Sequence, residues 1–282
     1  VGIGNATGAG TNAATVAASG TVWTVTGNTY VGYASGGNTL TISSGGKVAA
    51  DTLYVLIGAE PGADGNRIRV TGTGSTLSNL SGAPLHTLYV GRSGNSNTLE
   101  ILAGGQVASG NVRIGGGSGA TGTPSGNGAT VDGATSTWTI AGTLRVGAGT
   151  AGTNSGLDVT NGGAVTVTGN SFVGYDAVND DNHVLVSGND SQLTVQALTI
   201  SRVAGAANNL VTVANGGTLS AASITLGAAG GTNVGGLVIG AGGTSGWIDA
   251  HNDAVEVDAV GHSRPAVAVD QGDRPQGALD LF

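Results

Sequence analysis

GTVWTVTGNTYVGY, at residues 20–33, returns almost unchanged as GAVTVTGNSFVGY at residues 163–175. Both stretches close on an apolar–x–apolar–Gly landmark, and weaker copies of that landmark fill the chain between and beyond them. Seven steps separate Gly32 from Gly227, so the average spacing is about 28 residues. Self-similarity at a period of this size indicates a solenoid built of stacked units.

Each unit carries a second landmark, which is a short alternating strand followed by a Gly-Gly corner. Residues 38–42 read NTLTI and lead to Gly45-Gly46, and similar segments begin at Asn97, Gly156 and Asn209. The pattern predicts three short strands per unit with glycine-bearing corners between them. One such unit cannot bury its own apolar face, but stacked units pair strand on strand at about 4.8 Å and share one core.

The sequence therefore predicts an all-β fold, a single parallel β-helix of about eight to nine coils. We expect the helix to occupy residues 1–249. The last stretch, residues 250–282, is expected to be a non-repeat C-terminal tail that caps the helix or links subunits. The longer units carry their extra residues in Gly/Ser/Thr/Asn tracts such as 115–128, which are expected to loop out from one edge.

Composition limits the function. The 282 residues include 55 glycines, no Cys and only 9% charged residues, with a formal net charge of −8. An acidic chain without a basic patch argues against nucleic-acid binding. The absence of Cys excludes a disulfide scaffold and a thiolate metal site. No apolar run is long enough for a membrane-spanning helix.

The pattern Asn-x-Leu-x-Val/Ile-x-x-Gly-Gly-x-Val, followed by Leu-x-Val-Gly, resembles the strand repeats of bacterial autotransporter passenger domains. The resemblance covers roughly residues 13–249. It implies a right-handed β-helix, exported to the bacterial cell surface or beyond, that serves as a stalk, an adhesin or a matrix component. The first residue is Val, which suggests a processed or excised segment. The translocator barrel of that family is missing from the chain, and the tail departs from the repeat.

Aromatic and arginine side chains are predicted to form one outward stripe on the Leu-x-Val-Gly strands. Its members are Tyr30, Tyr54, Tyr89, Arg113, Arg145 and Phe172. Such a stripe stacks on sugar rings or docks a cell-surface partner through cation–π contacts. The alternative is a ladder that only stabilises neighbouring strands.

Acidic residues give weaker indications. Thr41, Arg69, Glu100 and Asp158 are expected in another outward column, where carboxylates suggest glycosidic chemistry or, more simply, an ion pair between adjacent coils. Asp176, Asp180 and Asp181 lie in an acidic loop that suits either a weak Ca²⁺ site or an Asx-rich turn. We predict no cofactor and no resident metal.

The tail carries alternating apolar residues, which are typical of strands. They are Val255, Val257, Val267, Val269, Leu279, Leu281 and Phe282. The last coil of a β-helix exposes unpaired backbone groups, so the tail is expected either to cap its own coil or to add strands to a neighbouring subunit.

We therefore expect a non-catalytic, extracellular structural or adhesive protein, a surface stalk or a subunit of a self-associating fibre or matrix. The alternative is a carbohydrate-active β-helix enzyme, a polysaccharide lyase or a glycoside hydrolase. Such an enzyme requires clustered Asp, Lys, Arg or His on one face, and the chain contains a single Lys.

Overall fold

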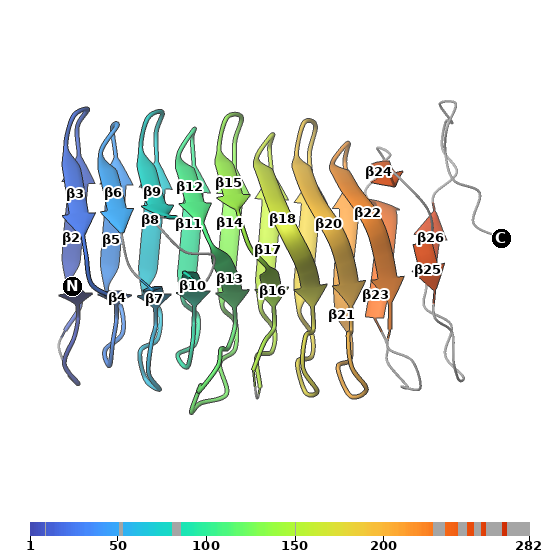
Figure 1. Ribbon diagram of the computed structural model, residues 1–282, viewed down its shortest axis with the longest axis horizontal. Helices are drawn as coiled ribbons and strands as arrows, with labels where there is room; N and C mark the ends of the chain where they lie inside the picture. Colours follow the sequence, from blue (N-terminus) through green and yellow to red (C-terminus); the bar gives the residue numbers. More distant parts are fainter. Residues whose placement is uncertain are drawn as a thin grey trace.

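The computed structural model of the chain is a parallel β-solenoid of about eight turns, stacked from the N-terminus to the C-terminus (Figure 1). It describes residues 1–8, 10–50, 53–80, 86–149, 151–227 and 235–241, and the backbone of strands at 247–250, 255–257 and 267–269. No helix occurs in these residues. The predicted fold class is confirmed.

Three columns of strands run along the stack, one strand of each per coil. The first column is β2 (Ala13–Ala17), β5 (Thr39–Ser43), β8 (Arg67–Thr71), β11 (Thr98–Leu102), β14 (Gly128–Asp132), β17 (Gly156–Thr160), β19 (His183–Ser187), β21 (Asn209–Ala214), β23 (Gly235–Ala241) and β26 (Val267–Val269). The second is β3 (Val22–Val25), β6 (Lys47–Ala50), β9 (Thr76–Asn79), β12 (Gln106–Ser109) and β15 (Thr137–Ile140). The third is β1 (Gly2–Ile3), β4 (Thr29–Val31), β7 (Tyr54–Ile57), β10 (Thr87–Val90), β13 (Asn111–Ile114) and β16 (Leu144–Val146).

In the later coils the second and third columns are continued by single long strands. These are β18 (Ala164–Val173), β20 (Gln192–Ile200) and β22 (Thr218–Leu226). β18 pairs with both β15 and β16, and its register with β20 shifts between Val167 and Asn170. The corner between the two columns has thus become an irregularity within one strand.

The core consists of aliphatic side chains stacked in register. Val31 lies opposite Ile57, Ile57 opposite Val90, and the same column continues to Val146 and Val173. All of these side chains are fully buried or nearly so. Because strand side chains alternate with a period of two, every second residue of each strand enters this shared interior and the others face outward.

A buried ladder of asparagines runs along one corner, just before the first column. Its members are Asn38, Asn66, Asn97, Asn127, Asn182 and Asn209, with Ser155 in the remaining place. The Oδ1 of Asn97 accepts hydrogen bonds from the backbone N–H of Asn66 at 2.9 Å and from its Nδ2 at 3.0 Å. The Nδ2 of Asn97 donates in turn to Asn127 at 3.1 Å. The ladder satisfies backbone N–H groups where the strand pairing is interrupted.

The glycine of each landmark leaves room for this ladder. Gly58 has a positive φ of 72°, and a Cβ at that position would overlap the side chain of Asn97. Gly32 stands in the same relation to Asn66. Thus the glycine of one unit and the asparagine of the next recur together because they share one steric fit between neighbouring coils.

The exception near the C-terminal end supports this interpretation. Ser201 replaces the landmark glycine, and Gly235 replaces the asparagine that would face it. The Oγ of Ser201 accepts a hydrogen bond from the Nδ2 of Asn209 at 3.1 Å, where the ladder ends. At this corner the larger residue lies on the earlier coil and the glycine on the later one, the reverse of the arrangement of Gly58 and Asn97.

Turns between the first and second columns alternate between two forms, a Gly-Gly corner and a turn that ends in serine. The Oγ of Ser75 accepts the N–H of Gly45, which lies in the Gly-Gly corner of the preceding coil, at 3.0 Å and donates to the carbonyl of Thr71 at 2.8 Å. Ser136 binds Gly104 in the same way. Pairs of coils are therefore joined by a serine of one turn that binds the glycine of the other.

The tail returns to its own helix. β24 (Trp247–Ala250) runs across the expected boundary at residue 249 and pairs with β22. β25 (Val255–Val257) also pairs with β22, and β26 pairs with β23, both in parallel. Within residues 250–282 these strands pair with the last coils, and the expected boundary at residue 249 stays a prediction. Leu279, Leu281 and Phe282 lie outside the described residues.

We predict that Asn97→Ala lowers the free energy of unfolding by about 3 kcal/mol, because it leaves two buried donors of Asn66 unpaired and removes one of the two hydrogen bonds that Oδ1 of Asn127 accepts from residue 97. Chemical denaturation measures the change. Asn95→Ala is the control: Asn95 is exposed and accepts one hydrogen bond from Ser125, so its loss should cost less than about 1 kcal/mol.

The exchange at Ser201 and Gly235 provides a second test. Gly58→Ser should be strongly destabilising alone, and adding Asn97→Gly should recover part of the loss. A double-mutant cycle is expected to give a favourable coupling of at least about 1 kcal/mol. Additive effects would show that the two positions do not share one space.

Thr29 is nearly fully buried in the third column, and its hydroxyl has no hydrogen-bond partner. Thr29→Val keeps the side-chain shape and removes the unpaired hydroxyl, so we expect a gain of about 1 kcal/mol in stability. Thr225→Val, at an outward position of the same column, should change the thermal midpoint little.

Candidate functional site

The outward residues of the third column form the candidate site. The register is Tyr30, Leu56, Tyr89, Arg113, Arg145 and Phe172, one per coil. Five of the six predicted members therefore lie in one column. Tyr54 was misplaced, because it pairs with Thr87 and Leu56 occupies the column instead. The Tyr54 ring still reaches the ring of Tyr89, with centroids 5.9 Å apart.

The N-terminal half of this column is covered by the chain itself. Leu56, Ala59 and Tyr89 form a small apolar cluster outside the main core, with Tyr30 packed against it. Only 6% of Tyr89 is exposed. Gly117, in the loop after β13, lies against the Tyr89 ring so closely that a Cβ there would meet it at 2.5 Å. The face of Tyr89 is thus used for packing and is closed to a sugar ring.

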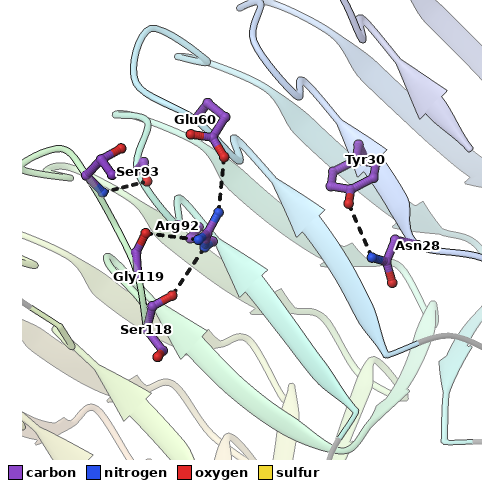
Figure 2. Close-up of polar contacts among 8 residues, drawn as sticks. Asn28, Tyr30, Glu60, Arg92, Ser93, Ser118 and Gly119 are labelled. Carbon is purple, nitrogen blue, oxygen red and sulfur yellow. Dashed lines mark hydrogen bonds and ion pairs between the residues drawn. The ribbon is translucent and has the colours of Figure 1, made fainter.

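Arg92 forms hydrogen bonds that hold the loop after β13 in place. Its Nη1 lies 3.2 Å from Oε1 of Glu60, and its Nη2 and Nε donate to the carbonyls of Gly119 and Ser118 at 2.9 and 3.4 Å (Figure 2). One guanidinium therefore joins three successive coils at the edge where the long loops gather. Its role is structural.

The C-terminal half contains a stack of two arginines and a tyrosine. The Cζ atoms of Arg145 and Arg202 lie 3.6 and 4.2 Å from the ring centroid of Tyr175. Carbon atoms this near a centroid must lie over a ring face, and two guanidiniums cannot share one face. Tyr175 is therefore held between the arginines of the coils before and after it. Phe172 meets the Tyr175 ring edge-on at 4.9 Å.

The electrostatics of this stack are those of a positive cluster that nearby Asp176 offsets only in part. Burial lowers the pKa of Arg145 from its ordinary value, and Arg113 and Arg202 lower it further, against the opposing effects of Tyr175 and Asp176. Arg113 lies directly opposite Arg145 in the parallel pairing of β13 with β16. Like charges placed opposite one another destabilise a sheet.

The second outward column is confirmed as an ion-pair site. Thr41, Arg69, Glu100 and Asp158 share one column of the first sheet, with Thr130 between the last two. Glu100 lies 3.5 Å from both Arg67 and Arg69. Asp158 lies 3.4 Å from Nε2 of His183.

The acidic loop uses its oxygens on the backbone. Oδ2 of Asp176 accepts the N–H of Gly149 at 2.8 Å, and Oδ1 of Asp180 accepts the N–H of Ala207 at 2.7 Å. Asp181 has a positive φ of 58°, as turn residues do. In the described part of the chain, no three His, Asp or Glu side chains gather as metal ligands would.

Two residues of this candidate site are not among those predicted from the sequence. Tyr175 and Arg202 are the residues that complete the stack, and both directly follow a landmark position, Gly174 and Ser201. The signal was present in the quoted repeat, since Tyr33 follows Gly32 as Tyr175 follows Gly174. Tyr33 also meets Tyr30 edge-on, at 5.0 Å. The aromatic pair of one coil is thus repeated in the later coil.

Comparisons of the chain with protein-family models, with curated proteins and with solved structures returned no match. The resemblance to autotransporter passenger domains therefore stays a prediction from the sequence pattern. Across the described residues, no helix has the length and apolar character needed to cross a membrane.

We predict that Tyr175→Leu lowers the free energy of unfolding by about 1–2 kcal/mol, because both cation–π contacts are lost. Tyr175→Phe keeps the ring and should leave stability nearly unchanged. Denaturation in urea compares the two variants. Equal losses in both would mean that the phenolic hydroxyl, and not the stacking, holds this corner.

Proposed function

We propose that this protein is a non-catalytic, extracellular structural or adhesive β-helix, a rigid stalk or a subunit of a self-associating fibre or matrix. The supporting observation is that its interactions run from each coil to the next. The asparagine ladder, the serine turns and the ion pairs join residues about one coil apart, 25 to 33 positions along the chain. A molecule held together in this way is extended by adding coils.

The N-terminal end supports the self-associating form of this proposal. Among the described strands, β1, β2 and β3 each pair with a single neighbour, β4, β5 and β6, and no described strand pairs with their other edge. Val22 of β3 is 57% exposed, and Ala14 and Trp23 are only partly buried against the end of the core. Open strand edges recruit further chains.

The arrangement of carboxylates supports a non-catalytic role. Glu60 and Glu100 pair with arginines, and Asp64, Asp176 and Asp180 accept backbone N–H groups of a neighbouring coil. The alternative, a polysaccharide lyase or glycoside hydrolase, depends on carboxylates that are free to exchange protons. Among the described residues, the pair that such an enzyme would use is Asp158 with His183, which lie 3.4 Å apart. This pair is therefore the one to test for catalysis.

We expect the purified chain to release no products from acidic or neutral polysaccharides, and to form rods or ordered fibres in electron micrographs of concentrated samples. Resistance of the coil body to limited proteolysis is the matching solution measurement. The control for assembly is a variant with Lys introduced at Val22, on the open edge of β3. Turnover that disappears in Asp158→Asn would overturn the structural proposal in favour of an enzyme.

A further inference from the structure

Three arginines without a carboxylate partner gather on one outer face. Among the described arginines, Arg67, Arg69 and Arg92 form ion pairs with glutamates. Arg113, Arg145 and Arg202 form none within the described residues, and they lie on or directly after the third-column strands of neighbouring coils. We call these three residues the arginine patch. The patch persists in a chain whose net charge is −8.

This arrangement costs the fold stability. Arg113 and Arg145 stand directly opposite each other on β13 and β16, where like charges repel. Elsewhere the same chain places a glutamate beside each outward arginine, as Glu100 does for Arg69. A carboxylate from the protein would neutralise the patch in the same way. Asp176 offsets the charge of Arg145 only in part, and within the described residues no carboxylate forms an ion pair with the patch, which leaves a positive site for an anionic ligand.

Stacking prepares the guanidiniums for such a ligand. Arg145 and Arg202 lie over the two faces of Tyr175, and Arg113 lies 5.8 Å from the centroid of Tyr89. Nη1 of Arg202 also donates to the carbonyl of Tyr175 at 3.3 Å. The remaining N–H groups of guanidiniums held in this way match carboxylate and sulfate oxygens in pairs. The ring faces themselves are occupied, so recognition falls to the arginines.

The spacing favours a sparsely charged linear ligand. Arg113, Arg145, Phe172 and Arg202 follow four successive strands, so the patch extends about 14 Å along the helix axis at the usual strand spacing. Duplex DNA carries one charge per roughly 1.7 Å of axis, and its binding depends on neutralising many phosphates. Three arginines on an acidic protein are too few for that. Acidic polysaccharides carry carboxylates or sulfates at intervals of whole sugar units.

We propose that the arginine patch binds the carboxylate or sulfate groups of an acidic polysaccharide that lies along the helix axis. The inference rests on the proposed extracellular role for access to such a ligand, and it adds a binding activity to a scaffold. Phe172, half-buried between Arg145 and Arg202, supplies the apolar floor between the charges.

The test is titration calorimetry of the full chain with three oligosaccharides of equal length: a galacturonate oligomer, a sulfated oligomer and a neutral glucose oligomer. We expect one or both acidic ligands to bind and the neutral one to fail. Arg202→Gln removes an exposed arginine without disturbing the core and should weaken binding about tenfold. The triple variant Arg113→Gln, Arg145→Gln and Arg202→Gln should abolish binding of the acidic oligosaccharides. The two acidic arms identify whether carboxylate or sulfate is preferred.

The matched control is a triple variant with Gln at 67, 69 and 92, which changes the net charge by the same amount but removes only arginines that have glutamate partners. It should bind as the unmodified chain does, and denaturation curves confirm that each variant is folded. The assignment would be overturned if both triple variants lost affinity for the acidic oligosaccharides to the same extent. It would also be overturned if a single-stranded oligodeoxynucleotide bound as tightly as those oligosaccharides. Absence of binding overturns this inference and leaves the structural role standing, whereas cleavage of a bound oligosaccharide overturns the structural role.

Discussion

Every coil of this protein must find its backbone hydrogen-bond partners in the coil before it or the coil after it. A three-strand coil has no sheet of its own, so its N–H and C=O groups are satisfied only by in-register stacking. At the corner before the first column, where strand pairing stops, the same requirement is met by side chains. Asn66 donates twice to Asn97, and Asn97 donates to Asn127. The register of the whole stack depends on this continuity.

The requirement explains why a glycine ends most of the landmarks. A buried asparagine needs space on its neighbouring coil, and that space exists only where the neighbour has no side chain. Gly58 and Gly32 provide it at landmark corners. Ser201 fills the corresponding corner, and there Gly235 has replaced the asparagine. The repeat in the sequence therefore reflects a repeated contact between neighbouring coils, in which each glycine is explained by its asparagine and each asparagine by its glycine.

Because the inward positions are committed to the core and the corners to the ladder, the outward positions are those that can differ from coil to coil. The protein uses them in two ways. Around Glu100 and Glu60, charges of opposite sign are set beside one another and hold coils and loops together. Around Tyr175, charges of one sign are held on an aromatic ring with no comparable compensation. The first arrangement stabilises the solenoid. The second destabilises it through repulsion between like charges, which the proposed anionic ligand would relieve.

The alternation of apolar residues and the return of the Gly-ended landmark were enough to determine strands, parallel stacking and the inward set, because both periods are properties of local backbone geometry. They could not determine lateral alignment. Leu53-Tyr54-Val55 reads like Leu88-Tyr89-Val90, yet pairing is counted back from the following glycine, so Leu56 takes the place expected for Tyr54. The ladder was hidden for the same reason, since the bonds that join Asn66, Asn127 and Asn182 to their neighbours form only when coils lie on one another. The Arg145–Tyr175–Arg202 stack likewise joins three coils, and only the tertiary structure decides which side chains of different coils share one face.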